Sequence, residues 1–200
     1  MSKILVIGAR GRAGRAAVEE ARRRGHEVTS AARTPVADMV TGDVTDAERI
    51  ADLALDHDAV IAAVYDGGTE PGVFFPAASR ALVDGLEKAG VGRLVWVGLA
   101  SILPTADGTP LMDGPGYPQE YRSFYLAHQA ALDTFAASTL DWVSVAPAGD
   151  FNHADPTRSG GYRVVPGDAG GLISYADLAI ALVDEVDQPA HHRAAIGVVV

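Results

Sequence analysis

Short apolar runs alternate along the chain with longer segments in which apolar residues recur at helical spacing. The first run, residues 4–7, is unbroken and rich in β-branched side chains, which is typical of a parallel strand buried on both faces. An Ala- and Arg-rich segment follows at residues 12–24 and ends at Gly25, where a helix C-cap is expected. The pattern predicts a strand followed by a helix.

The same alternation continues to the end of the chain. Further strands are predicted at residues 27–32, 59–64, 93–98, 142–146 and 195–200, and further helices at 45–55, 73–89, 118–138 and 174–187. Thr45 and Glu48 have capping-box spacing, Pro118 suits a first helical turn, and Ser174 suits an N-cap. Strands alternating with helices predict an α/β fold: a doubly wound parallel sheet in a three-layer Rossmann arrangement.

Two Gly- and Pro-rich stretches, residues 101–117 and 152–171, interrupt this rhythm. Both leave the carboxyl ends of predicted strands, where open α/β sheets bind ligands, and long loops are commonly functional. We therefore expect one domain over residues 1–200, with these two loops on the substrate side.

The composition excludes several kinds of catalytic and metal-binding site. The chain has no Cys and only two lysines, Lys3 and Lys88, so disulfides, thiolate catalysis and Cys-ligated zinc are excluded. His153, His191 and His192 lack metal-ligand spacing, and no metal is expected. A membrane helix needs about 18 consecutive apolar residues, and no segment of the chain approaches that length. The first apolar run is also too short for a secretory signal. A cytoplasmic protein without a membrane partner is expected.

Charge is unevenly distributed. The net charge is −10, yet residues 1–33 hold eight basic and three acidic side chains, which is +5. A globally acidic protein is a poor nucleic-acid binder, whereas a local basic segment suits a small anionic ligand. Arg22, Arg23 and Arg24 can alternatively complement a helix C-terminus.

The turn after the first strand has a G-x-x-G-x-x-G pattern: Gly8, Ala9, Arg10, Gly11, Arg12, Ala13 and Gly14. The first Gly permits a tight turn, the second permits close approach of a pyrophosphate, and the third permits close helix–strand packing. The following helix N-terminus offers free N–H groups to phosphates. This placement predicts nucleotide binding, and the alternative is a purely structural turn.

The end of the second predicted strand indicates which nucleotide. An NAD site usually has an Asp or Glu there for the ribose 2′-hydroxyl, but this chain has Ala31, Ala32 and Arg33. A guanidinium at Arg33, with Arg10 as a second candidate, can pair with a 2′-phosphate. We expect NADP(H) rather than NAD(H). The alternative is that the Arg33 side chain faces solvent and contacts no cofactor.

The glycine spacing resembles the short-chain dehydrogenase/reductase superfamily. The resemblance extends to the small, atypical NAD(P)H-binding subgroup that includes NmrA-like and biliverdin/flavin-reductase-like proteins, on residues 25–29, 42–46, 57–61, 93–95, 118–121, 140–142, 144–151 and 173–174. It implies that Asp43 and Val44 border the adenine, and that Ala62, Ala63 and Val64 line the cofactor. For Asp43, a turn or helix-entry role is the alternative. A monomer or homodimer is implied.

The chain departs from the superfamily's catalytic Ser and Tyr-x-x-x-Lys. Tyr121 is followed four residues later by Tyr125, and Lys88 belongs to an earlier helix. A tyrosine without that lysine stays protonated and can still donate a hydrogen bond, which favours reduction over alcohol oxidation. Tyr121, Tyr125 and His128 would share one helix face, either toward a cleft or packed on the sheet. Tyr121 is the candidate proton donor or substrate contact, and Ser101 is either its partner or an ordinary loop serine.

These features favour a reductase that transfers hydride to a small carbonyl, quinone or flavin-like acceptor. One alternative is a non-catalytic NADP-binding redox sensor or regulator of the NmrA-like kind. A second is an epimerase-like isomerase, against which the missing lysine and Arg33 both argue. The pattern does not specify the acceptor.

Overall fold

An eight-stranded sheet forms the centre of the computed structural model, which describes residues 1–200. Its strand order is β3-β2-β1-β4-β5-β6-β10-β8. The strands are β1 (Lys3–Ile7), β2 (Glu27–Ala32), β3 (Val40–Thr41), β4 (Ala59–Ala62), β5 (Arg93–Val97), β6 (Asp141–Pro147), β10 (Ala194–Val199) and β8 (Arg163–Val165). All are parallel except β8, which pairs antiparallel with β10. A separate parallel pair joins β7 (Asp150–Phe151) to β9 (Leu172–Ile173).

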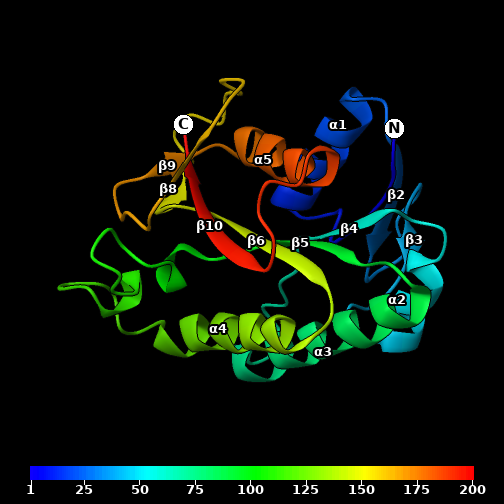
Figure 1. Ribbon diagram of the computed structural model, residues 1–200, viewed down its shortest axis with the longest axis horizontal. Coiled ribbons are helices and arrows are strands. Elements are labelled where there is room, and N and C mark those ends of the chain that lie inside the picture. The colour runs from blue at the N-terminus through cyan, green and yellow to red at the C-terminus, as the bar shows by residue number, and fades with distance from the viewer.

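Helices cover both faces of the sheet (Figure 1). On one face lie α1 (Arg12–Arg23) and α5 (Tyr175–Asp187), and on the other α2 (Ala47–Ala54), α3 (Pro71–Ala89) and α4 (Arg122–Ala137). The chain winds outward from β1 in both directions, to β2 on one side and β4 on the other. The predicted doubly wound Rossmann fold is confirmed, and its switch point lies between β1 and β4, where such sheets bind ligands.

Alternate residues of the strands supply two hydrophobic cores. Leu5 and Ile7 belong to the core beneath α2, α3 and α4, whereas Ile4 and Val6 belong to the core beneath α1 and α5. All four side chains are at most 2% exposed, and burying one such side chain stabilises the fold by roughly 1.5–3 kcal/mol. A strand with both faces buried needs apolar residues throughout, which explains the unbroken run.

Three predicted helix starts differ from the structure, and for α3 the first residue is Pro71 instead of residue 73. Helix α2 is capped by Asp46, whose carboxylate accepts from the Arg49 N–H at 3.0 Å, while the Thr45 N–H and hydroxyl both donate to Asp43. Helix α4 begins at Arg122 rather than at residue 118, so Pro118 lies before it. The prediction at Ser174 is confirmed, since its hydroxyl oxygen accepts from the Asp177 N–H at 3.0 Å.

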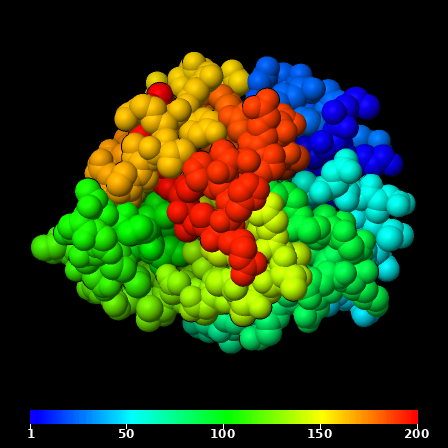
Figure 2. All heavy atoms as spheres, viewed as in Figure 1, coloured from blue at the N-terminus to red at the C-terminus, as the bar shows by residue number.

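The two long loops lie beside each other at one end of the molecule, and Figure 2 shows them as neighbouring green and yellow-orange projections. The Gly167 N–H donates to the Pro104 carbonyl oxygen at 2.9 Å. Neither loop is wholly irregular: one contains the 3₁₀ turns η1 (Ala100–Ile102) and η2 (Leu111–Asp113), and the other contains β8. The Asp177 carboxylate holds the second loop by accepting from the N–H groups of Ser159 and Gly160.

Candidate functional site

The glycine loop connects β1 to α1 in a conformation that only glycine fits at two positions. Gly8 has φ +81°, and a Cβ there would lie 2.1 Å from the Ala63 carbonyl oxygen. A Cβ at Gly14 would lie 2.2 Å from the Gly8 carbonyl oxygen. Gly11 differs, because it is the N-cap of α1, has an ordinary φ of −68°, and would place a Cβ in no close contact.

No side chain caps the N-terminus of α1. The first N–H groups of a helix have no intrahelical partner, and they carry a partial positive charge. The first turn also contains no acidic residue. The turn therefore presents unneutralised donors at the switch point of the sheet, which is the arrangement that binds phosphates in proteins.

A cleft of about 570 Å³ opens in front of this turn. Most of the residues expected to hold a cofactor line it: Gly8, Arg10, Gly11, Arg12, Ala13, Arg33, Asp43, Val44, Ala63 and Val64. Ala9, Gly14 and Ala62 do not line it, because they are buried beneath its floor. The cleft follows the carboxyl ends of β2, β1, β4 and β5.

Five of the eight basic residues in the N-terminal segment form two groups with different contacts. Arg10, Arg12 and Arg33 line the cleft. Arg23 and Arg24, in contrast, hold the buried Glu20 carboxylate at 2.6 and 2.8 Å. Burial alone would raise the pKa of Glu20, but these two guanidinium groups lower it to about 2. Part of the positive charge therefore stabilises the packing of α1, and Arg10, Arg12 and Arg33 are available to a ligand.

The β2 end of the cleft carries charges of both signs. Arg33 forms an ion pair with Asp66, which comes from the loop after β4. Asp66 also accepts from the Gly68 N–H and the Thr69 hydroxyl, and the Arg33 guanidinium, with these bonds, holds its pKa at about 2. Arg10 donates to the Thr34 hydroxyl at 2.9 Å. Residue spacing does not point to Asp66, because β3, α2 and β4 lie between it and Arg33 along the chain.

The β5 end of the cleft is apolar and aromatic. Its walls are Val97, Gly98, Leu99, Phe124, His128, Phe151 and Tyr175. Phe151 and Tyr175 stack with ring centroids 3.9 Å apart, and the Arg12 guanidinium lies 5.2 Å from the Tyr175 centroid. A Cβ at Gly98 would lie 2.2 Å from Ser144 Oγ, so a larger residue there would have to displace that hydroxyl.

The expected face of α4 is divided in the structure. Tyr121 precedes the helix as its N-cap, is 58% exposed, and is not among the residues that line the cleft. Tyr125 is buried against Tyr117, and burial raises the pKa of its hydroxyl. Of the three, only His128 lines the cleft, so the three side chains do not face it together; Tyr125 and His128 are buried, as in the packing alternative, and Tyr121 is exposed.

Phe124 and His128 are the residues of α4 that line the cleft. They are four positions apart, which is the spacing of a Tyr-x-x-x-Lys pair. A Tyr-x-x-x-Lys pair that faced this cleft would therefore stand at positions 124 and 128, and not at positions 121 and 125. Ser101 is buried near this wall without lining the cleft, and its Oγ lies 2.9 Å from the Tyr117 hydroxyl. Phe124 and His128 have the same four-residue spacing as Tyr121 and Tyr125, and the tyrosines are the more obvious candidates from residue type alone.

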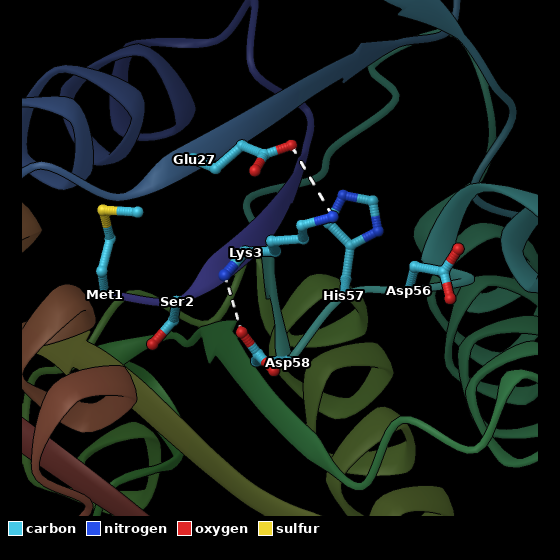
Figure 3. Close-up of a pocket in the computed structure, with 7 residues that line it drawn as sticks. All are labelled: Met1, Ser2, Lys3, Glu27, Asp56, His57 and Asp58. Atoms are coloured by element: carbon cyan, nitrogen blue, oxygen red, sulfur yellow. Dashed lines mark hydrogen bonds and ion pairs between the residues drawn. The ribbon is translucent and has the colours of Figure 1, made fainter.

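A second hollow of about 550 Å³ lies at the opposite, amino ends of β1 and β2 (Figure 3). The Lys3 N–H donates to Asp58 at 2.7 Å, and the Lys3 ammonium lies 4.0 Å from Glu27. His57 contacts Thr29 and the Leu55 carbonyl oxygen. These polar groups satisfy one another. In the whole chain, no group of three or more His, Cys, Asp or Glu side chains is arranged to hold a metal ion.

The fold, the glycine turn and the cleft together define a dinucleotide-binding Rossmann protein. The profile of the NAD(P)H-binding family matches residues 8–189, and the chain belongs to that family. The predicted resemblance to an NAD(P)H-binding family is thereby confirmed. None of the helices combines the length and apolar character needed to cross a bilayer.

Similar proteins come from several bacteria. YwnB of Bacillus subtilis (strain 168) is 35% identical over 204 residues, which is 94% of each chain. A crystal structure from Streptococcus pneumoniae TIGR4, named a "putative NADH-flavin reductase", is 31% identical with TM-score 0.83, over 100% of this chain and 99% of that one. A "putative exported protein" from Burkholderia pseudomallei is 34% identical with TM-score 0.85, over 100% of both chains.

Proposed function

We propose that this protein binds NADP(H) along the cleft and reduces a small carbonyl, quinone or flavin-like acceptor by hydride transfer. The observation that carries the proposal is the uncapped N-terminus of α1, which opens through Gly11 into the cleft. In this arrangement the pyrophosphate lies on the α1 N–H groups, and Arg10 and Arg12 add positive charge. Family membership supports a nicotinamide cofactor.

The choice of NADP(H) rests on the β2 end of the cleft. Arg33 is where an NAD site would have an acidic residue, and a guanidinium pairs well with a 2′-phosphate. Asp66 opposes this, because its carboxylate already pairs with Arg33. An ion pair near the surface is weak, so a doubly charged 2′-phosphate displaces it. Asp43 and Val44 then border the adenine.

The nature of the acceptor follows from the β5 end. Bound NADPH supplies the hydride, and the protein orients the partners. The Leu99, Phe124 and Phe151 side chains form an apolar wall that suits a flat, uncharged acceptor and excludes water. Tyr121 and Ser101 do not line this wall, so the proposal assigns the acceptor's orientation to packing. It does not rely on proton donation by either residue.

One observation favours a second function. The place of a Tyr-x-x-x-Lys pair is taken by Phe124 and His128, so the apolar end lacks the usual acid. A protein that binds NADP without turnover, as a redox sensor, needs no acid there. The same replacement disfavours an epimerase, which would have to deprotonate an alcohol.

Two measurements on the purified wild-type protein separate these functions. NADPH fluorescence titration tests binding, and NADPH oxidation at 340 nm is followed against panels of quinones, flavins and carbonyls. Binding with turnover of any acceptor supports the reductase. Tight binding without turnover of any acceptor supports the sensor, and absence of NADPH and NADH binding contradicts both.

A further inference from the structure

The turn between β4 and α3, residues 65–69, connects the two ends of the cleft. Asp66 pairs with Arg33 at the β2 end. The preceding residue, Tyr65, packs edge-on against Phe124 at the α4 end, with ring centroids 5.5 Å apart. Tyr65 and Asp66 both line the cleft. Two adjacent residues therefore contact the two groups that are proposed to meet the 2′-phosphate and the acceptor.

The turn is a compact unit with few ties to the rest of the protein. The Asp66 carboxylate accepts from the Gly68 N–H at 3.0 Å and from the Thr69 hydroxyl at 2.8 Å, so the charge and the turn move together. Arg33 is the only residue outside the turn that forms a hydrogen bond or an ion pair with it. A ligand that changes the Arg33–Asp66 pair therefore acts on the whole turn.

The Tyr65 ring covers part of the apolar wall but is held there weakly. It is 65% exposed, and aromatic packing on Phe124 and on Phe75, whose ring centroid is 6.3 Å away, is its contact with that wall. Individual aromatic contacts of this kind are small in free energy. Movement of Tyr65 would expose more of Phe124, which lines the cleft.

A bound 2′-phosphate supplies a force that moves the turn. The Arg33 guanidinium and the hydrogen bonds within the turn hold the pKa of Asp66 at about 2, so the carboxylate is charged at neutral pH. A phosphate that pairs with Arg33 takes over the guanidinium and brings negative charge close to Asp66, which it repels. NAD(H) has a neutral hydroxyl in place of this phosphate and leaves the ion pair intact.

We propose that Tyr65 is a gate over the acceptor end of the cleft, and that the 2′-phosphate of the cofactor opens it by displacing Asp66. The proposal rests on the proposed function, because it takes the 2′-phosphate as the ligand of Arg33. NADP(H) binds first and uncovers the wall for the acceptor, whereas NAD(H) leaves the gate closed. Tyr65 acts only through its position and takes no part in hydride transfer.

Fluorine NMR of the whole protein labelled with 3-fluorotyrosine follows the gate without any acceptor. The chain has six tyrosines, and Tyr65→Phe identifies the resonance of Tyr65. We expect this resonance to shift with saturating NADP⁺ and to shift much less with NAD⁺, which lacks only the 2′-phosphate. Tyr162 does not line the cleft, and its resonance, identified by Tyr162→Phe, is the internal control that should move with neither.

Calorimetry measures the free energy of opening the gate. Because NADP⁺ must displace Tyr65 from its aromatic neighbours, Tyr65→Ala should bind NADP⁺ about 2- to 10-fold more tightly than wild type, and NAD⁺ within about twofold. Tyr65→Phe keeps the ring and should match wild type. Asp66→Asn removes the repelling charge, so in that background Tyr65→Ala should no longer change NADP⁺ affinity.

The other outcomes separate the gate from the proposed function. Equal shifts of the Tyr65 resonance with NADP⁺ and NAD⁺ would overturn the gate, as would a Tyr65→Ala variant whose NADP⁺ affinity is unchanged or lower. An equal gain for both nucleotides would mean that Tyr65 obstructs the cleft independently of the 2′-phosphate, which also overturns it. The resonance comparison uses the wild-type chain, so it decides the question even if Tyr65→Ala unfolds. Wild-type protein that binds neither nucleotide contradicts the proposed function itself.

Discussion

The two ends of the cleft differ in polarity. The end formed by β1 and β2 is polar: an uncapped helix terminus, three arginines and two carboxylates, with Arg33 about half exposed at 56%. The end formed by β5 and α4 is apolar, and its one ionisable imidazole stays neutral. The polar end can recognise a ligand by charge at long range, whereas the apolar end can only select by shape and by single hydrogen bonds. Affinity should therefore depend mainly on the polar end, and the identity of the acceptor on the apolar end.

The largest effect is expected at Gly11. Gly11→Asp should fold, because φ is −68° and an added Cβ meets nothing closer than 3.4 Å. Asp is a good N-cap residue, so Tm should be equal or slightly higher. Its carboxylate would accept the α1 N–H groups and repel the pyrophosphate, and we expect at least about 100-fold weaker dinucleotide binding. Calorimetry with NADPH checks this.

The matched variant is Gly11→Ala, which adds the Cβ without the charge; because the Cβ alone obstructs the pyrophosphate, it should weaken NADPH binding about tenfold, less than Gly11→Asp. Equal losses in the two variants would show that space, and not the free N–H groups, limits binding at this position. Unchanged binding in Gly11→Asp would place the dinucleotide elsewhere.

The next effect tests the charge at the β2 end. Arg33→Asp replaces the guanidinium by a carboxylate beside Asp66 and should weaken NADPH roughly 30-fold, the value of a charge-assisted contact. NADH lacks the 2′-phosphate, so its affinity should change little. Parallel titrations of both cofactors measure the ratio, with Arg33→Gln as the intermediate case. Equal losses for NADPH and NADH would contradict the NADP(H) assignment.

The polar end was more accessible to prediction from the sequence than the apolar end, and the reason is physical. The glycine turn is local: Gly8, Gly11 and Gly14 follow a strand directly, and their spacing alone determines their geometry. The phase of α4 is not local. It depends on where the helix begins and how it packs on the sheet, and a start at Arg122 brings Phe124 and His128 to the cleft.

Asp66 illustrates the same limit at the polar end. It reaches Arg33 only because β4 and β2 both flank β1 in the sheet, and residue spacing does not encode strand order. The strands themselves were predicted well, since burial on both faces demands unbroken apolar runs. The short strands β3, β7, β8 and β9 were missed, because two or three residues carry no periodicity.

A smaller effect is expected at Asp66. Asp66→Asn keeps an oxygen for the Gly68 N–H, replaces the oxygen that accepts from the Thr69 hydroxyl by an amide NH₂, and removes the charge that competes for Arg33. NADPH should bind about three- to fivefold more tightly, consistent with a weak surface pair, and NADH should be unaffected. Glu70→Gln makes the same charge change at an exposed residue outside the cleft and serves as the control.

A loss of NADH affinity in Asp66→Asn would change the assignment of the β2 end of the cleft. If Asp66→Asn weakens NADH and leaves NADPH unchanged, the carboxylate binds the ribose 2′-hydroxyl. The β2 end would then be an NAD site whose acidic residue comes from β4 instead of β2.

The smallest effect is expected at Tyr121. Because Tyr121 is 58% exposed and outside the cleft, Tyr121→Phe should change turnover with a reactive acceptor, and NADPH affinity, by less than about twofold. Tyr175→Phe, which removes the same hydroxyl from a residue that lines the cleft, is the comparison variant. A tenfold or larger loss of turnover in Tyr121→Phe, with NADPH affinity intact, would mean that the segment before α4 moves onto the acceptor. The apolar end would then acquire an acid during the reaction, and the contrast between the two ends would describe only the ligand-free protein.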